Sequence, residues 1–276
     1  MLGFLGLGTL FWGVAVEPDR LEVTRIEWPL PEWGPTEGRA RLVALADLHV
    51  VPGRRGERRL KEIADAVLEL NPDVVVILGD IVNGHMKDES LPPEEIASGL
   101  RPLLERCAVY YVLGNHDYAY GARKIHRAFM AEGLVPLEGR SVRIGFPNGR
   151  MLQLSGVRDD SCFPVRSVHV PARLLPSVPQ ILITHSPSLY PKVRGKVNLI
   201  LAGHTHGGQI CFPGGEPVSP APSHGCTRRM LRGGFYAEGG GPPMYISRGL
   251  GTSVLPIRLF CPPEIVCFDL RGAPGV

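Results

Sequence analysis

The sequence lacks the motifs of several common enzyme and binding-protein classes. It contains no Gly-x-Ser-x-Gly elbow, no Walker A loop and no His-Glu-x-x-His zinc motif. Its six cysteines form no Cys-x-x-Cys pair, which argues against a structural zinc site, and we expect them to be reduced and mostly buried. The net charge is only +3, and no basic stripe with interleaved aromatic residues is present, so nucleic acid is not an expected partner.

The N-terminal stretch MLGFLGLGTLFWGVAV, residues 1–16, lacks any charged side chain. As a helix it would span about 24 Å, which is shorter than the ~30 Å hydrocarbon core of a bilayer. It has no basic n-region and no clear cleavage site, so a cleaved signal peptide is not favoured. Two alternatives stay open. One is a helix packed on the protein; the other is an uncleaved membrane anchor with Trp12 at the interface and Arg20 and Arg25 beyond it, which would put the main domain in the cytoplasm.

The overall composition is that of a globular protein. The chain has 276 residues, of which 44% are hydrophobic and 21% charged, so it is long enough to bury a sizeable core. No internal repeat, linker or low-complexity segment divides it. We therefore expect one domain over residues 38–272 in addition to the hydrophobic segment 1–16.

Five short apolar runs have the length and β-branched content of buried strands, and each ends in a polar residue that can bind a metal. In open α/β sheets, ligands bind beyond the carboxyl ends of the strands, so we expect these polar residues to meet. The runs are RLVALAD ending at Asp47, DVVVILGD ending at Asp80, CAVYYVLGNHD ending at Asn115, His116 and Asp117, QILITH ending at His185, and VNLILAGH ending at His204.

Helices are predicted between these strands. The apolar spacing in ERRLKEIADAVLELNPD predicts a helix over residues 57–71 that Pro72 ends. Further helices are expected over residues 94–106 and over 122–133, the latter closed by a glycine. SVRIGFPNGRMLQLSGV, residues 141–157, predicts a hairpin about its Asn-Gly dipeptide. The fold class is α/β with mixed sheets.

Two pairs of candidate ligands, Asp47 with His49 and His204 with His206, are spaced two residues apart, which puts both members of a pair on one face of an extended segment. A mixture of carboxylate, amide and imidazole ligands suits Mn, Fe or Zn better than Ca or Mg. Seven ligands are too many for one tetrahedral ion and suit two divalent ions that share a bridge. Such a centre would attract phosphate, because only two carboxylates oppose the four positive charges. The seven are Asp47, His49, Asp80, Asn115, His185, His204 and His206.

The motifs Asp-x-His, Gly-Asp, Gly-Asn-His-Asp, a lone His after a strand and Gly-His-x-His occur in that order over residues 41–207. This pattern resembles the calcineurin-like metallophosphoesterases. The stretch GHTHGGQICFP and the tail YISRGLGTSVLPIRLFCPPEIVCFDL are similar to a bacterial subgroup of phosphohydrolases of the YkuE type. That subgroup often carries an N-terminal hydrophobic segment, which favours the membrane-anchor alternative for residues 1–16.

The resemblance implies a role for each matching position and a two-sheet β-sandwich flanked by helices, with the metal site at the carboxyl ends of the strands. His116 would act as a general acid or as a donor to the transition state, and Asp117 would orient it by hydrogen bonding. The first metal would be held by Asp47, His49 and His206, the second by Asn115, His185 and His204, and both by Asp80.

The resemblance also implies an activity, that of a metal-dependent phosphoric ester hydrolase. Metal-bound hydroxide would attack a phosphoester or pyrophosphate bond directly. The expected substrate is a small-molecule or lipid-linked phosphoester, with a UDP-diacylglucosamine-like pyrophosphate as the alternative. A nuclease or a catalytically silent scaffold is less favoured, because the charge is near neutral and every ligand position is filled. Membrane association is expected, with a soluble cytoplasmic enzyme as the alternative; the oligomeric state is not predicted.

Three other residues have roles that the sequence leaves open. His224 lies in a Gly- and Pro-rich region and is a candidate substrate contact. Asp159 follows a predicted strand and is expected in a solvated turn, although it could line the cleft. Arg248 could contact phosphate or only brace the site.

Overall fold

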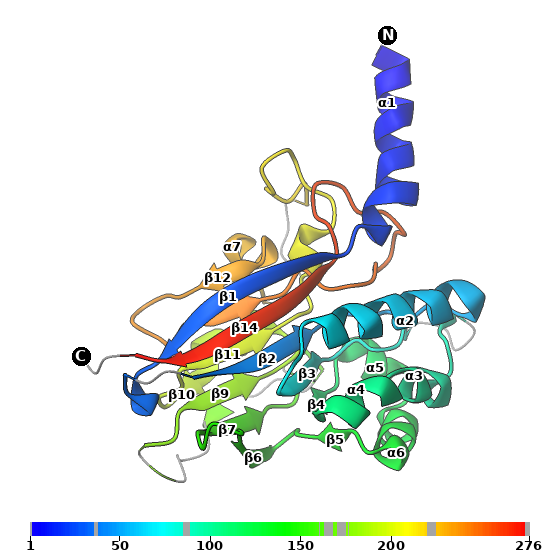
Figure 1. Cartoon of the computed structure of the whole chain (residues 1–276). Coiled ribbons are helices and arrows are strands. Elements are labelled where there is room, and N and C mark those ends of the chain that lie inside the picture. Colours follow the sequence, from blue (N-terminus) through cyan, green and yellow to red (C-terminus); the bar gives the residue numbers. More distant parts are fainter. Residues whose placement is uncertain are drawn as a thin grey trace.

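The computed structural model consists of two six-stranded sheets with helices on their outer faces (Figure 1), and the predicted site residues follow the ends of their strands. The first sheet has the strand order β1-β14-β2-β3-β4-β5, with β14 antiparallel to β2 and the other neighbours parallel. The strands are β1 (Glu22–Leu30), β14 (Glu264–Gly272), β2 (Arg39–Leu45), β3 (Val74–Leu78), β4 (Ala108–Val112) and β5 (Val135–Pro136). The structure describes residues 2–35, 38–84, 89–159, 161–162, 168–169, 175, 177–219 and 225–273.

The second sheet has the order β12-β13-β11-β9-β7-β6. Its four central strands are parallel, and both edge strands, β12 and β6, run antiparallel to their neighbours. A short parallel pair of β8 (Val168–His169) and β10 (Val193–Arg194) lies apart from it. The strands are β12 (Gly234–Tyr236), β13 (Met244–Ile246), β11 (Leu199–Ala202), β9 (Gln180–Ile183), β7 (Met151–Gly156) and β6 (Arg140–Gly145).

The two sheets pack face to face on a common apolar core. Val74 and Val76 of β3 belong to the same buried cluster as Leu199 and Leu201 of β11. The alternate side chains of β3 join a second cluster that covers the outer face of the first sheet. A strand buried on both faces must be apolar throughout, which explains the run VVVIL in β3. The predicted two-sheet sandwich with flanking helices is confirmed.

Helices cover the outer face of the first sheet (Figure 1). The helix expected from residue 57 begins four residues earlier, and the expected helix over 94–106 is two helices that meet at Leu100. Pro102 explains the break, because proline has no N–H to donate in a helix interior but is tolerated in a first turn, where it lies here. The helices are α2 (Gly53–Glu69), α3 (Pro93–Gly99), α4 (Arg101–Arg106), α5 (Asn115–Tyr120) and α6 (Ala122–Glu132); α7 (Arg228–Leu231) lies over the second sheet.

Two other local predictions are confirmed. Gly133 ends α6 in the left-handed conformation, with φ +105°. The predicted hairpin is formed by β6 and β7, and Gly149 in its turn has φ +76°. The structure adds β1, which pairs with β14 along its whole length and extends the first sheet to residues before position 38, where we expected the domain to begin.

The N-terminal segment projects from the body of the protein (Figure 1). Helix α1 (Leu2–Phe11) continues as a π-helical turn over Trp12–Val16 and a 3₁₀ turn over Glu17–Asp19. Within the described part of the chain, no helix combines the length and the apolar character that crossing a bilayer requires.

Candidate metal centre

The predicted ligands all follow the carboxyl ends of parallel strands. Asp47 lies two residues beyond β2, Asp80 two beyond β3, His185 two beyond β9 and His204 two beyond β11, while Asn115 begins α5 three residues after β4. Because β2 to β4 belong to one sheet and β9 and β11 to the other, the centre is built at the shared edge of both sheets.

The backbone at the centre is held in an uncommon conformation. A positive φ is costly for residues with a side chain and concentrates at functional sites, where the surrounding structure must enforce it. The residues concerned, with φ between +41° and +72°, are Asp47, His49, Asp80, His204 and His206. We infer that the strand ends turn sharply so that these side chains point inward.

Two glycines allow the loops of the centre to approach one another. A Cβ atom on Gly114 would lie 2.2 Å from Oδ1 of Asp80, and one on Gly203 would lie 2.7 Å from Oδ2 of Asp47. Both distances are far below van der Waals contact, so only a hydrogen fits at either position. These glycines thus let the two carboxylates sit against the neighbouring loops.

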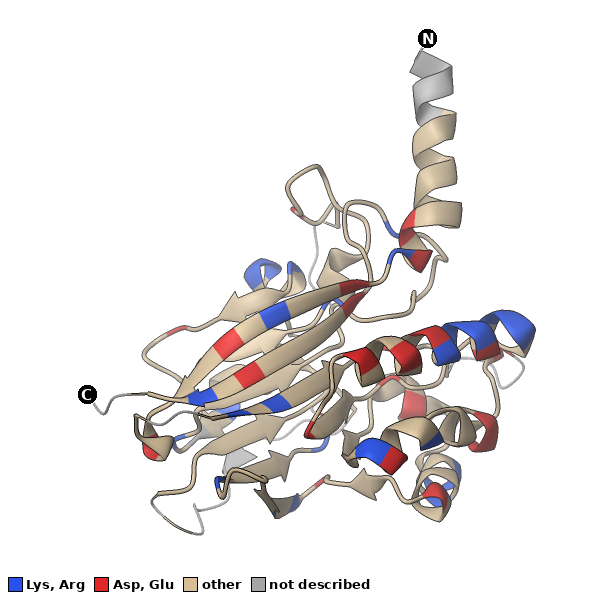
Figure 2. Cartoon of the chain, in the orientation of Figure 1, with Lys and Arg blue, Asp and Glu red and all other residues tan. Residues whose placement is uncertain are grey.

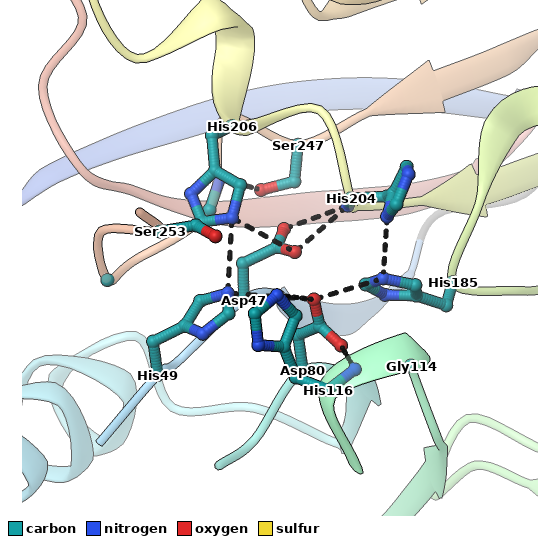
Figure 3. Close-up of polar contacts among 12 residues, drawn as sticks. Asp47, His49, Asp80, Gly114, His116, His185, His204, His206, Ser247 and Ser253 are labelled. Atoms are coloured by element: carbon teal, nitrogen blue, oxygen red, sulfur yellow. Dashed lines mark hydrogen bonds and ion pairs between the residues drawn. The ribbon is translucent and has the colours of Figure 1, made fainter. Parts of the chain in front are cut away.

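The first group of donor atoms comes from Asp47, His49 and His206 (Figure 3). The Nε2 atoms of the two histidines lie 3.1 Å apart, and Nε2 of His206 lies 3.7 Å from Oδ1 of Asp47. Oδ2 of Asp80 lies 3.6 Å from Nε2 of His49. All four side chains are buried, so the donor atoms face an enclosed point rather than solvent.

The second group comes from Asp80, Asn115, His185 and His204 (Figure 3 shows all but Asn115 labelled). Nε2 of His185 lies 3.0 Å from Nδ1 of His204, 3.1 Å from Oδ1 of Asn115 and 3.3 Å from Oδ2 of Asp80. The same oxygen of Asp80 therefore lies near both groups, as a bridging ligand requires.

This arrangement fits two divalent cations. The carboxylates of Asp47 and Asp80 are 0% and 2% exposed, and buried carboxylates are stable when they are paired or coordinate metals. The lone pairs of imidazole nitrogens 3.1 Å apart repel unless one carries a proton or a cation lies between them. Carboxylate, amide and imidazole groups are all donors that divalent cations accept.

The charges of the metal-free centre are strongly perturbed. Burial raises the pKa of Asp47 to about 7, and the nearby charge of Asp80 adds to the effect. Burial also acts to raise the pKa of Asp80, but the charge and hydrogen bond of His185 outweigh it and hold that pKa well below its usual range. In turn, the charge and hydrogen bond of Asp80 raise the pKa of His185, although burial acts to lower it. Burial lowers the pKa of His49 to about 3. A proton on His185 therefore offsets the negative charge of Asp80, as a bound cation would.

His116 lies beside this centre, with its ring 4.6 Å from that of His49 in an edge-to-face contact. Its backbone N–H donates to Oδ1 of Asp80 over 2.9 Å, and its Nδ1 contacts the carbonyl oxygen of Asn83. A carbonyl can only accept, so Nδ1 carries a hydrogen and Nε2 is the atom left to face a substrate; Nε2 lies 4.0 Å from Oδ2 of Asp80.

Asp117 makes three hydrogen bonds to backbone groups near His116, and its expected role in orienting His116 stays a prediction. The carboxylate of Asp117 accepts from the backbone N–H groups of Ile81 (2.9 Å), Val82 (3.1 Å) and Gly114 (2.9 Å). It therefore joins the loop after β3 to the loop after β4. Asp117 supports the backbone beside Asp80 and Asn115, and Asn83 fixes the imidazole.

Arg258 supports the centre and was not found from the sequence. It is 0% exposed, and its guanidinium donates to the carbonyl oxygens of Gly251, Cys261 and Arg248 over 2.6–3.0 Å. Its Nη2 lies 3.5 Å from Nδ1 of His206. A single arginine in an apolar stretch carries no sequence signal of such a role.

The three residues left open have different outcomes. Arg248 pairs with Glu22 and Glu264 at 3.3 Å each, so it braces the sheet rather than facing the metal centre. Asp159 is fully buried, contrary to the expected solvated turn, and accepts a 3.2 Å hydrogen bond from the backbone of Ser161. His224 lies outside the described residues.

A two-sheet α/β sandwich that brings this donor set to its strand ends is the architecture of a metallophosphoesterase. The family model for calcineurin-like phosphoesterases matches residues 40–208, and the chain belongs to this family, as its motifs predicted.

Two curated bacterial relatives align over most of the chain. Phosphodiesterase YaeI of Escherichia coli is 31% identical over 244 residues, which cover 83% of this chain and 82% of YaeI. The uncharacterized metallophosphoesterase YkuE of Bacillus subtilis is 28% identical over 219 residues, covering 77% and 73%. Among solved structures, a dimetal phosphatase from Danio rerio aligns with a TM-score of 0.45 and 12% identity, covering 76% of this chain and 88% of that one.

Proposed function

We propose that this protein hydrolyses a phosphoester or pyrophosphate bond at a centre of two divalent metal ions, Mn, Fe or Zn. One observation carries the proposal: Oδ2 of Asp80 lies 3.6 Å from Nε2 of His49 and 3.3 Å from Nε2 of His185, so it is within reach of both donor groups. When bound, two cations would supply Lewis acidity toward phosphoryl oxygens and a nucleophilic hydroxide at neutral pH.

The side chains of the chain divide the remaining work. Asp47, His49 and His206 would hold one ion, and Asn115, His185 and His204 the other. His116 would act at the leaving oxygen. Its Nδ1 hydrogen is committed to the carbonyl of Asn83, so Nε2 can donate only when the imidazole is doubly protonated. In that state it would protonate the leaving group or stabilise its developing charge, an effect typically of ~10²–10⁴-fold.

The catalytic unit would be a single domain. We assign it to the expected residues 38–272 together with β1, since the nine residues of β1 pair in register with β14 at the edge of the first sheet. Pairing along the whole strand ties β1 to the same sheet that carries Asp47 and Asp80. Truncation before residue 38 would therefore remove part of the catalytic fold.

For the substrate, a small-molecule phosphodiester is favoured, since YaeI is named a phosphodiesterase. A lipid-linked ester, such as a UDP-diacylglucosamine-like pyrophosphate, is the second candidate. Its basis is the projecting segment 1–16, through which the enzyme would associate with a membrane and keep its catalytic domain in the cytoplasm. Trp12 at the base of that segment, followed by Arg20, supports this orientation.

The test is hydrolysis of bis(p-nitrophenyl) phosphate and p-nitrophenyl phosphate by protein of measured metal content. We expect turnover with added Mn²⁺ and its loss in Asp80→Ala, whereas Arg232→Ala at an exposed surface pair should keep it. Inactivity of fully metallated protein on monoesters, diesters and pyrophosphates would refute the proposal. Fractionation of the full-length protein against a form lacking residues 1–16 tests membrane association.

A further inference from the structure

Large apolar side chains are exposed together at one end of the molecule. Three segments contribute: α1, the loop around residue 212 and the loop over residues 253–260, which lie near one another at the base of α1 (Figure 1). We define the apical surface by six of these side chains, whose exposed fractions range from 46% to 90%: Leu7, Phe11, Phe212, Val254, Leu255 and Phe260.

Hydrogen bonds fix these segments to one another. The carbonyl oxygen of Gly13 accepts from the N–H of Arg258 over 2.9 Å, and the carboxylate of Glu17 accepts from the N–H of Cys261 over 2.7 Å. The carbonyl oxygen of Leu259 accepts from the N–H of Cys211 over 2.8 Å. The apical surface is therefore one built unit rather than three independent loops.

The 253–260 loop exposes its apolar tip in a strained conformation. Val254 is 90% exposed and has φ +65°, which is a rare outlier for a β-branched residue. The side-chain amide of Gln209 holds this turn: it donates to the carbonyl oxygen of Leu255 and accepts from the N–H of Ser253, each over 2.8 Å. An exposed valine in this conformation adds no stability to the protein in water. We therefore infer that its side chain contacts another molecule.

The chemistry of the apical surface favours a lipid bilayer over a protein groove. A groove covers one stripe of a helix, but α1 is apolar on every side, with the sequence LGFLGLGTLF. At its base the ring of Trp12 is 41% exposed while its indole N–H bonds to Glu17, and the guanidinium of Arg20 lies 5.7 Å from the ring centroid. An aromatic ring with one apolar and one polar side is typical of the membrane–water interface.

Positive charge lies beside the base of α1. Arg59 of α2 donates to the carbonyl oxygen of Pro18 over 3.1 Å, and this contact brings the first turns of α2 against the N-terminal segment. Arg54 and Arg55 in those turns are exposed, and Figure 2 shows basic residues gathered at that end of α2. Basic residues beside an apolar contact surface favour anionic lipid headgroups.

We propose that the apical surface docks on an anionic phospholipid bilayer, with Val254 and Leu255 as a second insertion point beside α1. This deepens the membrane association proposed above by adding a second contact beside residues 1–16, and it does not depend on the proposed hydrolysis. A cleft lined by Pro18, Arg55 and Pro256 lies beside this surface and reaches His49.

The test is sedimentation of the full-length protein with vesicles of phosphatidylcholine alone or with phosphatidylglycerol. We expect wild-type protein to bind the anionic vesicles. The affinity of the double variant Val254→Asp/Leu255→Asp for them should be lower by about tenfold or more. Aspartate tolerates a positive φ better than valine, so the fold is retained. The double variant Met130→Asp/Val135→Asp, at two exposed apolar side chains far from the apical surface in sequence, adds the same two negative charges and should bind like wild type.

A second measurement reports insertion directly. Wild-type protein gives the baseline, which is the quenching of its three native tryptophans by brominated acyl chains. In Val254→Trp the quenching should exceed that baseline. Equal vesicle binding by the double variant and wild type would overturn the proposal, as would no binding by wild type. An oligomer that exists without lipid and dissociates in the double variant would instead assign the surface to a second copy of the chain. Hydrolysis of soluble p-nitrophenyl esters should be unchanged in all variants.

Discussion

The Nε2 atoms of His49 and His206 lie 3.1 Å apart, although 157 positions separate the two residues in the chain. His49 follows β2 in the first sheet, and His206 follows β11 in the second. A cation shared by these nitrogens would link the strand ends of both sheets, so its binding would add to the stability of the fold as well as to the chemistry of the site.

Removal of metal should therefore lower thermal stability. A ligand that binds only the folded state stabilises it by ~2.7 kcal/mol when present at a hundredfold excess over its dissociation constant. We expect a chelator to lower the melting temperature of the purified protein and added Mn²⁺ or Zn²⁺ to restore it, as followed by circular dichroism. In Asp80→Ala the melting temperature should no longer respond to metal; an equal response in that variant would contradict the assignment of Asp80 to both donor groups.

Gly114→Ala should disable the centre through a steric effect alone. Gly114 has φ −104°, which any residue adopts, so alanine adds no backbone strain, but its Cβ would lie 2.2 Å from Oδ1 of Asp80. Asp80 must then move, and metal content and activity should fall at least as far as the ~10–100-fold typical of lost supporting contacts. Gly145→Ala is the control, because no atom lies within 4 Å of its added Cβ. Metal analysis and ester hydrolysis compare the two variants, and equal values would refute the steric argument.

Arg258→Met should destabilise the protein. The substitution removes a fully buried guanidinium and leaves the carbonyl oxygens of Gly251, Cys261 and Arg248 without their donor, at a cost of about 3 kcal/mol or more. For a chain of this size that corresponds to a fall in melting temperature of roughly 6–12 °C. Arg232→Met, which removes an exposed ion pair, should change it little. Similar falls in melting temperature in both variants would show that the buried hydrogen bonds of Arg258 add no more stability than an exposed ion pair.

The strand ends of the site could be predicted because two signals coincide there. Each buried strand is a continuous apolar run, and the first polar residues after Leu45, Leu78 and Ala202 are carboxylates or imidazoles. In each of these three runs, the ligand lies two residues beyond the strand end. That these ligands meet could be predicted from one rule, namely that the carboxyl ends of parallel strands share an edge of the sheet.

Other features could not be predicted because their signals are weak or non-local. β1 contains Pro29, which argues against a central strand, but it lies at the edge of its sheet, where a missing N–H is tolerated. The bonds of Asp117 to Ile81 and Val82 depend on how two loops pack. Arg258 acts on carbonyl groups that carry no side-chain signature in the sequence.

Metal binding should release protons and strengthen as the pH rises. In the metal-free protein the pKa of His185 is raised by the charge and hydrogen bond of Asp80, so His185 holds a proton at neutral pH. A cation needs the neutral imidazole, so the proton competes with metal below that pKa and no longer does so above it. Calorimetric titration with Mn²⁺ in buffers of different ionisation enthalpy should give more than one proton released per centre filled near pH 7, because Asp47, whose pKa is raised to about 7, must also lose its proton. A binding enthalpy that does not vary with the buffer would contradict this.

His116→Ala should slow hydrolysis in proportion to how poor the leaving group is. If Nε2 of His116 protonates the leaving oxygen, p-nitrophenolate needs that help least and an alkoxide most. We therefore expect kcat to fall ~10²–10⁴-fold for alkyl or phenyl esters and much less for the p-nitrophenyl ester, with metal content unchanged. His116→Gln separates the alternatives, because its amide can donate a hydrogen bond but not a proton. Recovery of the alkyl-ester rate in His116→Gln would assign His116 to transition-state stabilisation, whereas equal losses for all leaving groups in His116→Ala would remove it from the step at the leaving oxygen.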